Sequence, residues 1–441
     1  MRNCLVLTLA VGFCAVPVWA DERSTAREAA AKAFLEAMQK AEFEKATKDF
    51  DKTMLKVSGA DKLEKFWKDL RKQVGALKKT GTLRTGKRGK YDLLFIPCEF
   101  EKLKLDLRVT FDSDGKISGF GLELPAGDYK PPSYVRPDTF TEREVTVGDG
   151  EWKLPGTLTL PKGDGPFPAA VLVHGSGPQD RDETIGPSKP FRDLAWGLAS
   201  RGIAVLRYEK RTRAHGKKVV DVQDKFTIKE EVVDDALAAV GLLRKTEKID
   251  PKKVFVIGHS LGALMAPRMA ELEPAIAGIV MMAGNQRTLE DVILDQVTYI
   301  ASLQKEPTEE QKKALEDLKK QIALIKDGKL GPDTPKKELP FDQPAAYWLS
   351  LKAYDQSATA KRLKQPILVL QGERDYQVTM EDFAGWKKVL ADKKNARLKS
   401  YPNLNHLFAT GKGKARPEEY AKEGHVDVEV IDDIVAWIKG R

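Results

Sequence analysis

The sequence predicts an α/β protein with a mostly parallel β-sheet flanked by helices, preceded by a small α+β domain. Short, nearly all-apolar runs recur between helical stretches later in the chain, and a glycine-rich motif at 258–262 directly follows one of them. The runs are residues 169–173, 204–206, 254–257, 278–282 and 366–370. Runs of this kind are typical of parallel strands buried on both faces. Before residue 125, by contrast, helical periodicity gives way to alternation with a period of two.

The first twenty residues predict a signal peptide. Arg2 precedes an apolar run over 4–16, and the small-x-small pattern at 18–20 is typical of a cleavage site. The run is too short to span a membrane, and no later segment approaches about 18 apolar residues. We therefore expect a signal peptide at residues 1–20 and an exported protein, periplasmic or extracellular, without a membrane span.

The cysteines fit export without disulfides. Cys4 and Cys14 would leave with the signal peptide, so that only Cys98 remains and an intrachain disulfide is excluded. The strand-like setting of Cys98 predicts a buried structural thiol. A lipid anchor at Cys14 is the alternative, but Phe13 is too large for the residue that usually precedes such a cysteine.

The composition is that of an ordinary globular protein. The chain has 441 residues, 41% hydrophobic and 32% charged, which leaves room for two or three domains. A net charge of +9 raises the possibility of nucleic-acid or anionic-surface binding. However, the lysines are mixed with acidic residues along helical stretches such as 62–79 and 305–337, without interleaved aromatic residues. We therefore expect a solvated basic surface and no nucleic-acid partner.

A small α+β domain is predicted over residues 21–125. The stretch 24–56 has apolar residues at helical spacing, and a second helix is predicted from about 61 to 77. Three segments with a period of two then predict antiparallel strands, with a tight turn at 114–115. These segments are residues 91–95, 102–111 and 117–124.

A second, larger domain is predicted over residues 139–441, after a proline-rich linker at 126–138. Its elements besides the apolar runs are a hairpin at 142–147 and 152–160, a strand at 396–401 and a helix at 428–439. Residues 285–355 interrupt the alternation and predict a helical lid insertion. Its amphipathic helix is marked by Leu315, Leu318, Ile322 and Ile325.

The motif at 258–262 reads G-x-S-x-G and lies between a predicted strand and a predicted helix. This setting is typical of the nucleophile elbow of a serine hydrolase. The turn is so tight that Ser260 must take a strained backbone conformation, and a side chain at Gly258 or Gly262 would collide with its surroundings. Ser260 is therefore the candidate nucleophile.

A serine nucleophile needs a base in contact with it and a carboxylate that orients the base. In this setting the chain order should be serine, acid, histidine. Asp375 follows the end of a predicted strand, whereas its rival Glu373 lies nearer the strand and would point to the other side of the turn. Of the downstream histidines, His406 follows the strand 396–401 closely, and His425 is expected at the surface. The sequence thus predicts Asp375 and His406 as partners of the serine.

Acyl transfer also needs donors for the developing oxyanion. The glycine-rich loop 174–178 follows a predicted strand, and the N–H of Ser176 is the first predicted donor. The N–H of Leu261, directly after the serine, is the second. His174 and His259 are expected to support the site by packing or hydrogen bonding, not to act as bases.

Residues 140–441 resemble the α/β-hydrolases, and more narrowly the secreted esterases of the dienelactone-hydrolase and prolyl-oligopeptidase-like group. The segments that carry the resemblance are 174–178, 179–184, 207–211, 258–262, 372–375 and 405–406. The resemblance implies hydrolysis of a small-molecule ester through an acyl-enzyme, without a cofactor or metal. It also places Arg181, Asp182 and Arg211 near the site, either as an ion-paired scaffold or for recognition of a substrate carboxylate. The element order of the first domain resembles the cystatin-like domains found ahead of some secreted hydrolases.

Two other functions stay open on the sequence. A serine peptidase of the prolyl-oligopeptidase-like type is one, although about a hundred N-terminal residues are too few for its propeller. A non-catalytic binding protein on the same fold is the other, although all the residue types of the triad and both oxyanion elements are present. The acyl and alcohol groups of the substrate and the oligomeric state are not predicted.

Overall fold

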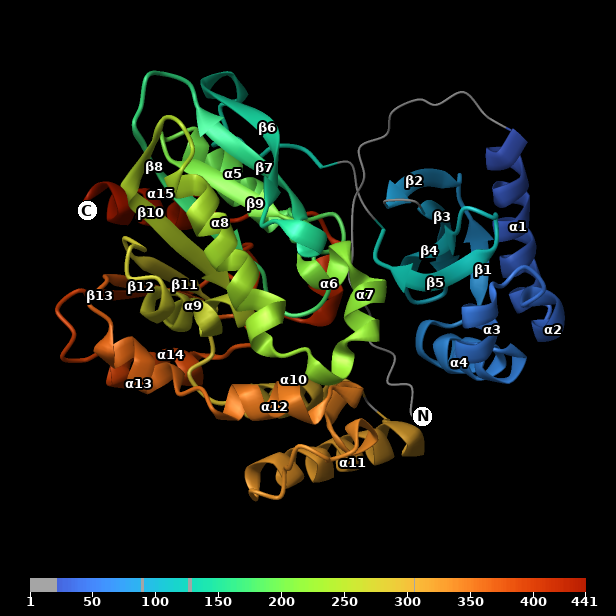
Figure 1. Cartoon of the computed structure of the whole chain (residues 1–441). Coiled ribbons are helices and arrows are strands. Elements are labelled where there is room, and N and C mark those ends of the chain that lie inside the picture. Colours follow the sequence, from blue (N-terminus) through green and yellow to red (C-terminus); the bar gives the residue numbers. More distant parts are fainter. Residues whose placement is uncertain (1–21, 89–90, 126–128, 305) are drawn as a thin grey trace. The chain divides into compact units, whose positions relative to one another are not determined.

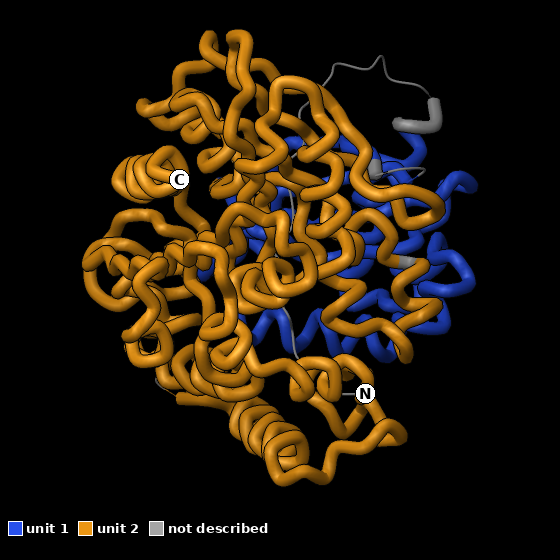
Figure 2. Tube along the Cα trace, turned by 60° about the vertical axis from the view of Figure 1, so that its left-hand side comes forward, with its two compact units in different colours: residues 1–128, 185–187 blue, residues 129–184, 188–441 orange. Residues whose placement is uncertain are grey.

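The computed structural model describes residues 22–88, 91–125, 129–304 and 306–441, so the predicted signal peptide at 1–20 lies outside the described residues. The chain forms two compact units (Figure 2). The first comprises residues 1–128 with 185–187, and the second comprises residues 129–184 and 188–441. Within the described part of the chain, no helix combines the length and apolar character needed to cross a bilayer.

The first unit begins with four helices. They are α1 (Glu22–Gln39), α2 (Phe43–Ala46), α3 (Lys52–Val57) and α4 (Ala60–Val74). The helical stretch expected over 24–56 is broken because Ala41 has a φ of 57° and because Asp51 caps a new helix, its carboxylate accepting from Met54 N at 2.7 Å. Gly75, with a φ of 82°, ends α4 before the predicted limit near Leu77.

A five-stranded antiparallel sheet completes this unit. Its strands are β1 (Leu77–Thr80), β2 (Arg84–Arg88), β3 (Tyr91–Phe100), β4 (Lys104–Phe111) and β5 (Ile117–Glu123). The order is β1-β3-β4-β5, with β2 also paired to β3. The sequence did not predict β1 and β2, because they are short, rich in basic residues and largely exposed. Cys98 on β3 is buried as predicted, and burial raises the pKa of its thiol to about 12.

The second unit contains an eight-stranded sheet in the order β13-β12-β11-β10-β8-β9-β7-β6. Its strands are β6 (Phe140–Val147), β7 (Leu154–Pro161), β8 (Phe167–Val173), β9 (Ala204–Tyr208), β10 (Ile249–His259), β11 (Ile279–Met282), β12 (Ile367–Gly372) and β13 (Ala396–Tyr401). All pairs from β13 to β9 are parallel, and β7 and β6 extend the sheet antiparallel. The predicted parallel runs are therefore confirmed.

Helices cover both faces of this sheet (Figure 1). The helices around it are α5 (Pro190–Ala199), α6 (Arg211–Ala214), α7 (Gly216–Asp221), α8 (Asp234–Arg244), α9 (Leu261–Leu272), α14 (Met380–Val389) and α15 (Val428–Lys439). Val254 and Val256 of β10 pack in one apolar cluster with α8, α9 and α14. Phe255 and Ile257 pack in a second cluster with α5 and α15. Alternate residues of β10 thus face opposite layers, as a buried strand requires.

The insertion between β11 and β12 is helical. It contains α10 (Leu289–Ser302), α11 (Glu309–Lys326), α12 (Ala345–Lys352) and α13 (Gln356–Arg362). The capping box of Thr308 and Gln311 starts α11, and the predicted positions Leu318, Ile322 and Ile325 are its buried residues. A π-helical turn (Lys229–Val233) precedes α8. Short 3₁₀ turns are Pro137–Thr139, Gly150–Trp152, Gln223–Lys225, Lys336–Glu338, Pro340–Asp342 and Pro417–Ala421.

Candidate active site

Ser260 lies on the sharp turn between β10 and α9. Its φ of 54° and ψ of −116° are rarely populated by a residue with a side chain. Hydrogen bonds hold the turn on both sides: Ser260 N donates to the carbonyl of Met282 at 2.9 Å, and Leu264 N donates to the carbonyl of Ser260 at 2.9 Å. The strained serine is therefore held by the neighbouring strand and by the first turn of the helix.

The two motif glycines are required by close backbone contacts. A Cβ at Gly258 would lie 2.3 Å from the carbonyl oxygen of Gly262, and a Cβ at Gly262 would lie 2.2 Å from that of Val173. Both distances are far below van der Waals contact. Because Gly262 touches the end of β8, the elbow and the loop that follows β8 are held side by side.

Asp375 lies in the loop after β12 and is buried. Its Oδ2 is 2.6 Å from Nδ1 of His406, and its Oδ1 accepts from the backbone N–H groups of Gln377 at 2.7 Å and Val378 at 3.1 Å. The rival Glu373 is exposed and accepts from the Ser400 hydroxyl at 2.8 Å. The structure thus brings Asp375, and not Glu373, to His406.

His406 follows β13 and is buried beside the elbow. Its carbonyl oxygen lies 2.9 Å from Nε2 of His259, and the two imidazole rings are 4.7 Å apart. In the part of the chain that the structure describes, no hydrogen bond joins the Ser260 hydroxyl to His406. The connection between the two residues runs through His259, the residue before the serine.

His425 is not the surface residue that the sequence suggested. Its side chain is only 27% exposed, and Nδ1 lies 3.1 Å from Oδ1 of the fully buried Asp193. The same carboxylate accepts from the Tyr129 hydroxyl at 2.6 Å. Because these contacts involve neither Asp375 nor Ser260, they give His425 a separate, structural environment.

The loop after β8 lies against the serine. A Cβ at Gly175 would be 3.2 Å from the Cβ of Ser260. The N–H of Gly175 donates to Oε1 of Glu183 at 2.6 Å, so this group is already used. Among the described residues, none accepts a hydrogen bond from the N–H of Ser176 or of Leu261. Both predicted oxyanion donors are therefore unpaired within the described chain, and Leu261 is the first residue of α9.

Two buried histidines flank the site with opposite electrostatics. Burial lowers the pKa of His174 to about 4, and its ring packs against Phe191 and Tyr208. Burial also lowers the pKa of His259, but the charge of Glu183, its hydrogen bond and the carbonyl of His406 together outweigh burial, and the net direction is upward. Oε2 of Glu183 lies 2.9 Å from Nδ1 of His259. Burial thus favours the neutral ring of His174, whereas the surroundings of His259 favour its protonated ring.

The charged loop residues form ion pairs within the protein. Arg181 pairs with Glu209 at 3.0 Å and with Glu144 at 2.7 Å. Asp182 pairs with Arg207, with Arg192 at 2.6 Å and with Lys189 at 3.5 Å. Arg211 pairs with Asp235. Of the two roles considered for Arg181, Asp182 and Arg211, these contacts are those of an ion-paired scaffold.

Sequence reasoning overlooked Glu183 and Lys210. Both lie in segments that carried the family resemblance, 179–184 and 207–211, yet neither was given a role. Charged residues in loops are usually solvated. In the folded chain, however, both residues are buried, and both bond to the backbone of Gly175. Their position beside glycine-rich and apolar segments was the sequence signal available.

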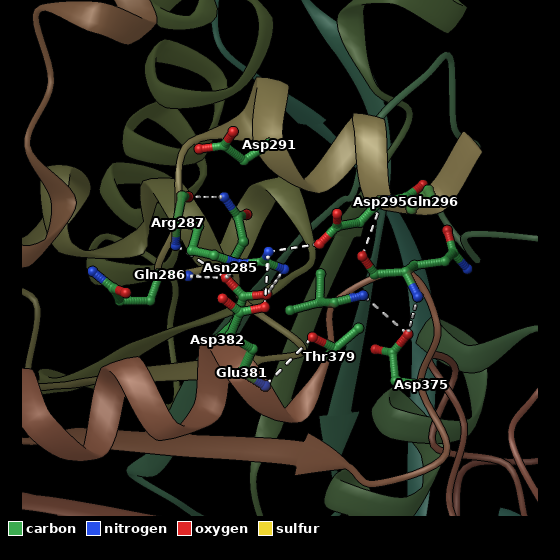
Figure 3. A network of polar contacts seen from close by, with 12 residues as sticks. Asn285, Gln286, Arg287, Asp291, Asp295, Gln296, Asp375, Thr379, Glu381 and Asp382 are labelled. Atoms are coloured by element: carbon green, nitrogen blue, oxygen red, sulfur yellow. Dashed lines mark hydrogen bonds and ion pairs between the residues drawn. The ribbon is translucent and has the colours of Figure 1, made fainter. Parts of the chain in front are cut away.

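Helix α10 of the insertion is tied to the loop that carries Asp375 (Figure 3). Gln296 of α10 donates to the carbonyl of Gln377 at 3.2 Å, and Gln377 N donates to Asp375. Nearby, Arg287 bridges Asp382 of α14 at 3.0 Å and Asp295 of α10 at 2.6 Å. Polar contacts thus connect the helical insertion with the loop of Asp375.

The described residues provide no set of ligands typical of a metal site. They contain no group of three or more histidine, cysteine, aspartate or glutamate side chains that could hold an ion. The arrangement instead offers a strained serine, a carboxylate-bound imidazole and unpaired backbone donors, which are the parts of nucleophilic acyl transfer.

The fold and this arrangement define an α/β hydrolase. A sequence model of the α/β hydrolase family matches residues 170–423, more than half of the chain, and the chain belongs to this family. A family of unknown function matches residues 31–120.

Among curated relatives, the esterase EstD of Thermotoga maritima is 41% identical over 378 residues, covering 85% of this chain and 86% of EstD. The esterase FrsA of Escherichia coli is 28% identical over 156 residues, 35% of this chain and 34% of FrsA. A solved esterase from Pyrococcus furiosus is 19% identical, covers 71% of this chain and 98% of its own, and superimposes with a TM-score of 0.43. The chain is accordingly a carboxylic-ester hydrolase of the α/β hydrolase family.

Proposed function

We propose that the protein cleaves small carboxylic esters through an acyl-enzyme, with Ser260 as nucleophile, His406 as base and Asp375 as the group that orients His406. The 2.6 Å contact between Asp375 and His406, beside the strained serine, carries this proposal. The carboxylate holds Nδ1 of the imidazole in its protonated form, so that Nε2 is left as a proton acceptor.

In the first half-reaction, Oγ of Ser260 forms a bond with the ester carbonyl carbon while Nε2 of His406 takes the hydroxyl proton. The electron pair of the carbonyl double bond moves to oxygen, and the N–H groups of Ser176 and Leu261 bind this oxyanion. The C–O bond to the alcohol then breaks, and His406 returns the proton to the leaving oxygen. In the second half-reaction, water bonds to the acyl carbon while His406 takes one of its protons. The bond to Oγ of Ser260 then breaks, His406 returns the proton to Oγ, and the acid is released.

The test uses two matched pairs of substitutions. Ser260→Ala should lower kcat on p-nitrophenyl acetate by about 10⁴-fold or more, and Asp375→Asn by about 10⁴-fold. The half-buried Ser400 and the exposed Glu373, which bond to each other, provide the controls: Ser400→Ala and Glu373→Gln should stay close to the unsubstituted enzyme. A fluorophosphonate should label Ser260 and no other serine. Retained turnover in Ser260→Ala, or equal losses in Asp375→Asn and Glu373→Gln, would overturn the assignment.

We also propose export, which rests on residues 1–20 alone. Sequencing of the mature N-terminus after expression in a Gram-negative host should find Asp21 as the first residue. Protein that accumulates in the cytoplasm with Met1 retained would contradict export without affecting the assignment of the triad.

A further inference from the structure

The peptide unit that joins Gly175 to Ser176 is held by a buried ammonium group. Nζ of Lys210 donates to the carbonyl oxygen of Gly175 at 2.8 Å, and Lys210 is 2% exposed. The C=O of Gly175 and the N–H of Ser176 belong to one planar unit and point in opposite directions when the peptide is trans. Lys210 therefore fixes the direction in which the Ser176 N–H points.

A second charged side chain holds the same loop from the preceding peptide unit. Oε1 of the buried Glu183 accepts the N–H of Gly175 at 2.6 Å. With its N–H and its C=O both bonded to buried charged groups, Gly175 has no freedom to rotate either peptide. The next donor along the loop, the N–H of Ser176, is the one left unpaired among the described residues.

Lys210 is itself held in place. Its ammonium lies 2.6 Å from Oε1 of Glu231, in the π-helical turn before α8, and its backbone N–H donates to the carbonyl of Gln179 at 3.1 Å. A buried ammonium is costly unless it is paired and hydrogen-bonded, and here the carboxylate and the carbonyl meet both needs. The position of Nζ is thus determined by the π-helical turn and the loop together.

We propose that Lys210 is a positioning residue that orients the Gly175–Ser176 peptide and polarises its N–H toward the oxyanion; this rests on the proposed function of that N–H. A cation bonded to the carbonyl oxygen draws electron density from the peptide and strengthens the N–H dipole at the other end. A donor fixed before the reaction needs no reorganisation when the negative charge develops. Lys210 acts through the peptide and does not touch the substrate.

The first test is Lys210→Met, which keeps the volume of the side chain and removes the ammonium. Removal of an oxyanion donor typically costs about 10²- to 10³-fold in kcat. Here the donor stays but loses its support, so kcat on p-nitrophenyl acetate should fall by roughly 10- to 100-fold while KM changes less than about 2-fold. The rate of fluorophosphonate labelling at Ser260 should fall by the same factor as kcat. The exposed Lys229, which pairs with Asp234 at 2.8 Å, supplies the control Lys229→Met, expected to leave kcat unchanged.

The second test separates positioning from a purely structural ion pair. Lys210→Met alone leaves the buried Glu231 without a cation, which lowers thermal stability for reasons unrelated to catalysis. The double variant Lys210→Met/Glu231→Gln removes both charges, so the thermal midpoint should return toward that of the unsubstituted enzyme while kcat stays low. Recovery of kcat together with stability in the double variant, or a single variant with unchanged kcat, would overturn the role of Lys210. Ser260→Ala serves as the reference: if it remains active, the proposed function fails whatever Lys210→Met shows.

Discussion

The imidazole of His259 is bonded to the backbone of His406: Nε2 lies 2.9 Å from the His406 carbonyl oxygen. A carbonyl oxygen can only accept, so Nε2 carries a proton, and the ion pair of Nδ1 with Glu183 requires the protonated ring. The residue before the serine thus joins the loop of His406 to Glu183. Glu183 in turn holds Gly175, so the imidazole of His259 links the elbow, the loop of His406 and the glycine-rich loop.

Removal of the negative charge should weaken this link. Glu183→Gln keeps an oxygen for the N–H of Gly175 but leaves the buried His259 without its counter-ion. Breaking a buried pair by removing one partner typically costs about 3 to 5 kcal/mol of unfolding free energy. We expect a loss of about 3 kcal/mol near pH 6, measured by urea unfolding, and a lower kcat because His406 is less well held. A stability within about 0.5 kcal/mol of the unsubstituted enzyme would contradict the ion pair.

The difference in unfolding free energy between Glu183→Gln and the unsubstituted enzyme should depend on pH. The pKa of His259 is raised above 6.5, so its stabilisation is complete below pH 6.5 and is lost as the pH rises through the raised value. Burial raises the pKa of Glu183, but the charge and the hydrogen bond of His259, with smaller contributions from His174 and the N–H of Gly175, together lower it below 4.5. The contribution of Glu183 is therefore lost as the pH falls through that lowered value. Unfolding curves from pH 4 to 9.5 should show the largest difference in unfolding free energy between the lowered pKa of Glu183 and the raised pKa of His259. The difference should be smaller at alkaline pH.

His174 should give the opposite dependence. Its folded-state pKa of about 4 lies below the ordinary 6.5, so between these values the unfolded chain binds a proton that the folded chain does not. Stability should therefore fall as the pH drops from 6.5 to 4, by about 3 kcal/mol for this group. His174→Phe should remove this part of the acid slope while the slope from the carboxylates remains. Identical slopes for the two proteins would show that His174 is not buried as a neutral ring.

The glycines of the elbow should not tolerate a methyl group. Gly262→Ala would place Cβ 2.2 Å from the Val173 carbonyl oxygen, and both atoms belong to rigid elements. We expect Gly262→Ala to abolish activity and to lower the thermal midpoint strongly or prevent folding. Gly241 in α8 has no atom within 4 Å of an added Cβ, so the control Gly241→Ala should be neutral or stabilising by up to about 1 kcal/mol. Similar midpoints for the two variants would contradict the close packing of the elbow.

Arg287 should contribute to stability through Asp382. This carboxylate is fully buried and accepts from the backbone of Gln286 and Arg287 as well as from the guanidinium. Arg287→Met removes the positive charge and should cost about 3 kcal/mol of unfolding free energy. Lys326, an exposed partner of Asp291 in the same insertion, supplies the control Lys326→Met, expected to cost less than about 1 kcal/mol. Equal losses of unfolding free energy in Arg287→Met and Lys326→Met would mean that the burial of Asp382 does not determine how much its ion pair stabilises the fold.

The strands and the elbow could be predicted because their signals are local. Apolar runs mark β8 to β12 directly, and the collisions at Gly258 and Gly262 follow from the turn itself. The edge strands β1 and β2 carry no such run, because their side chains face solvent. The break after α1 depends on a positive φ at Ala41, for which alanine gives no warning.

Not all of the buried charged residues at the site could be predicted from the sequence. Asp375 and His406 could be predicted because the residues of a triad have a known chain order. Glu183 and Lys210 have no such order, and their inward orientation depends on partners that are close only in the folded chain: Lys210 and Gly175 are 35 residues apart. His425 was misplaced for the same reason, since Asp193 precedes it by 232 residues.

The contact between His259 and His406 closes a loop of 147 residues. The site can therefore form during folding only after this loop has closed. Loops of this length close late, because their entropy must be overcome before the contact rewards it. β12 and β13 follow the other strands of this sheet along the chain, and the loops after them carry Asp375 and His406. Helices and the central strands can therefore form while these two residues are still apart from Ser260. We expect esterase activity to return after dilution from denaturant only when these two strands have joined the sheet.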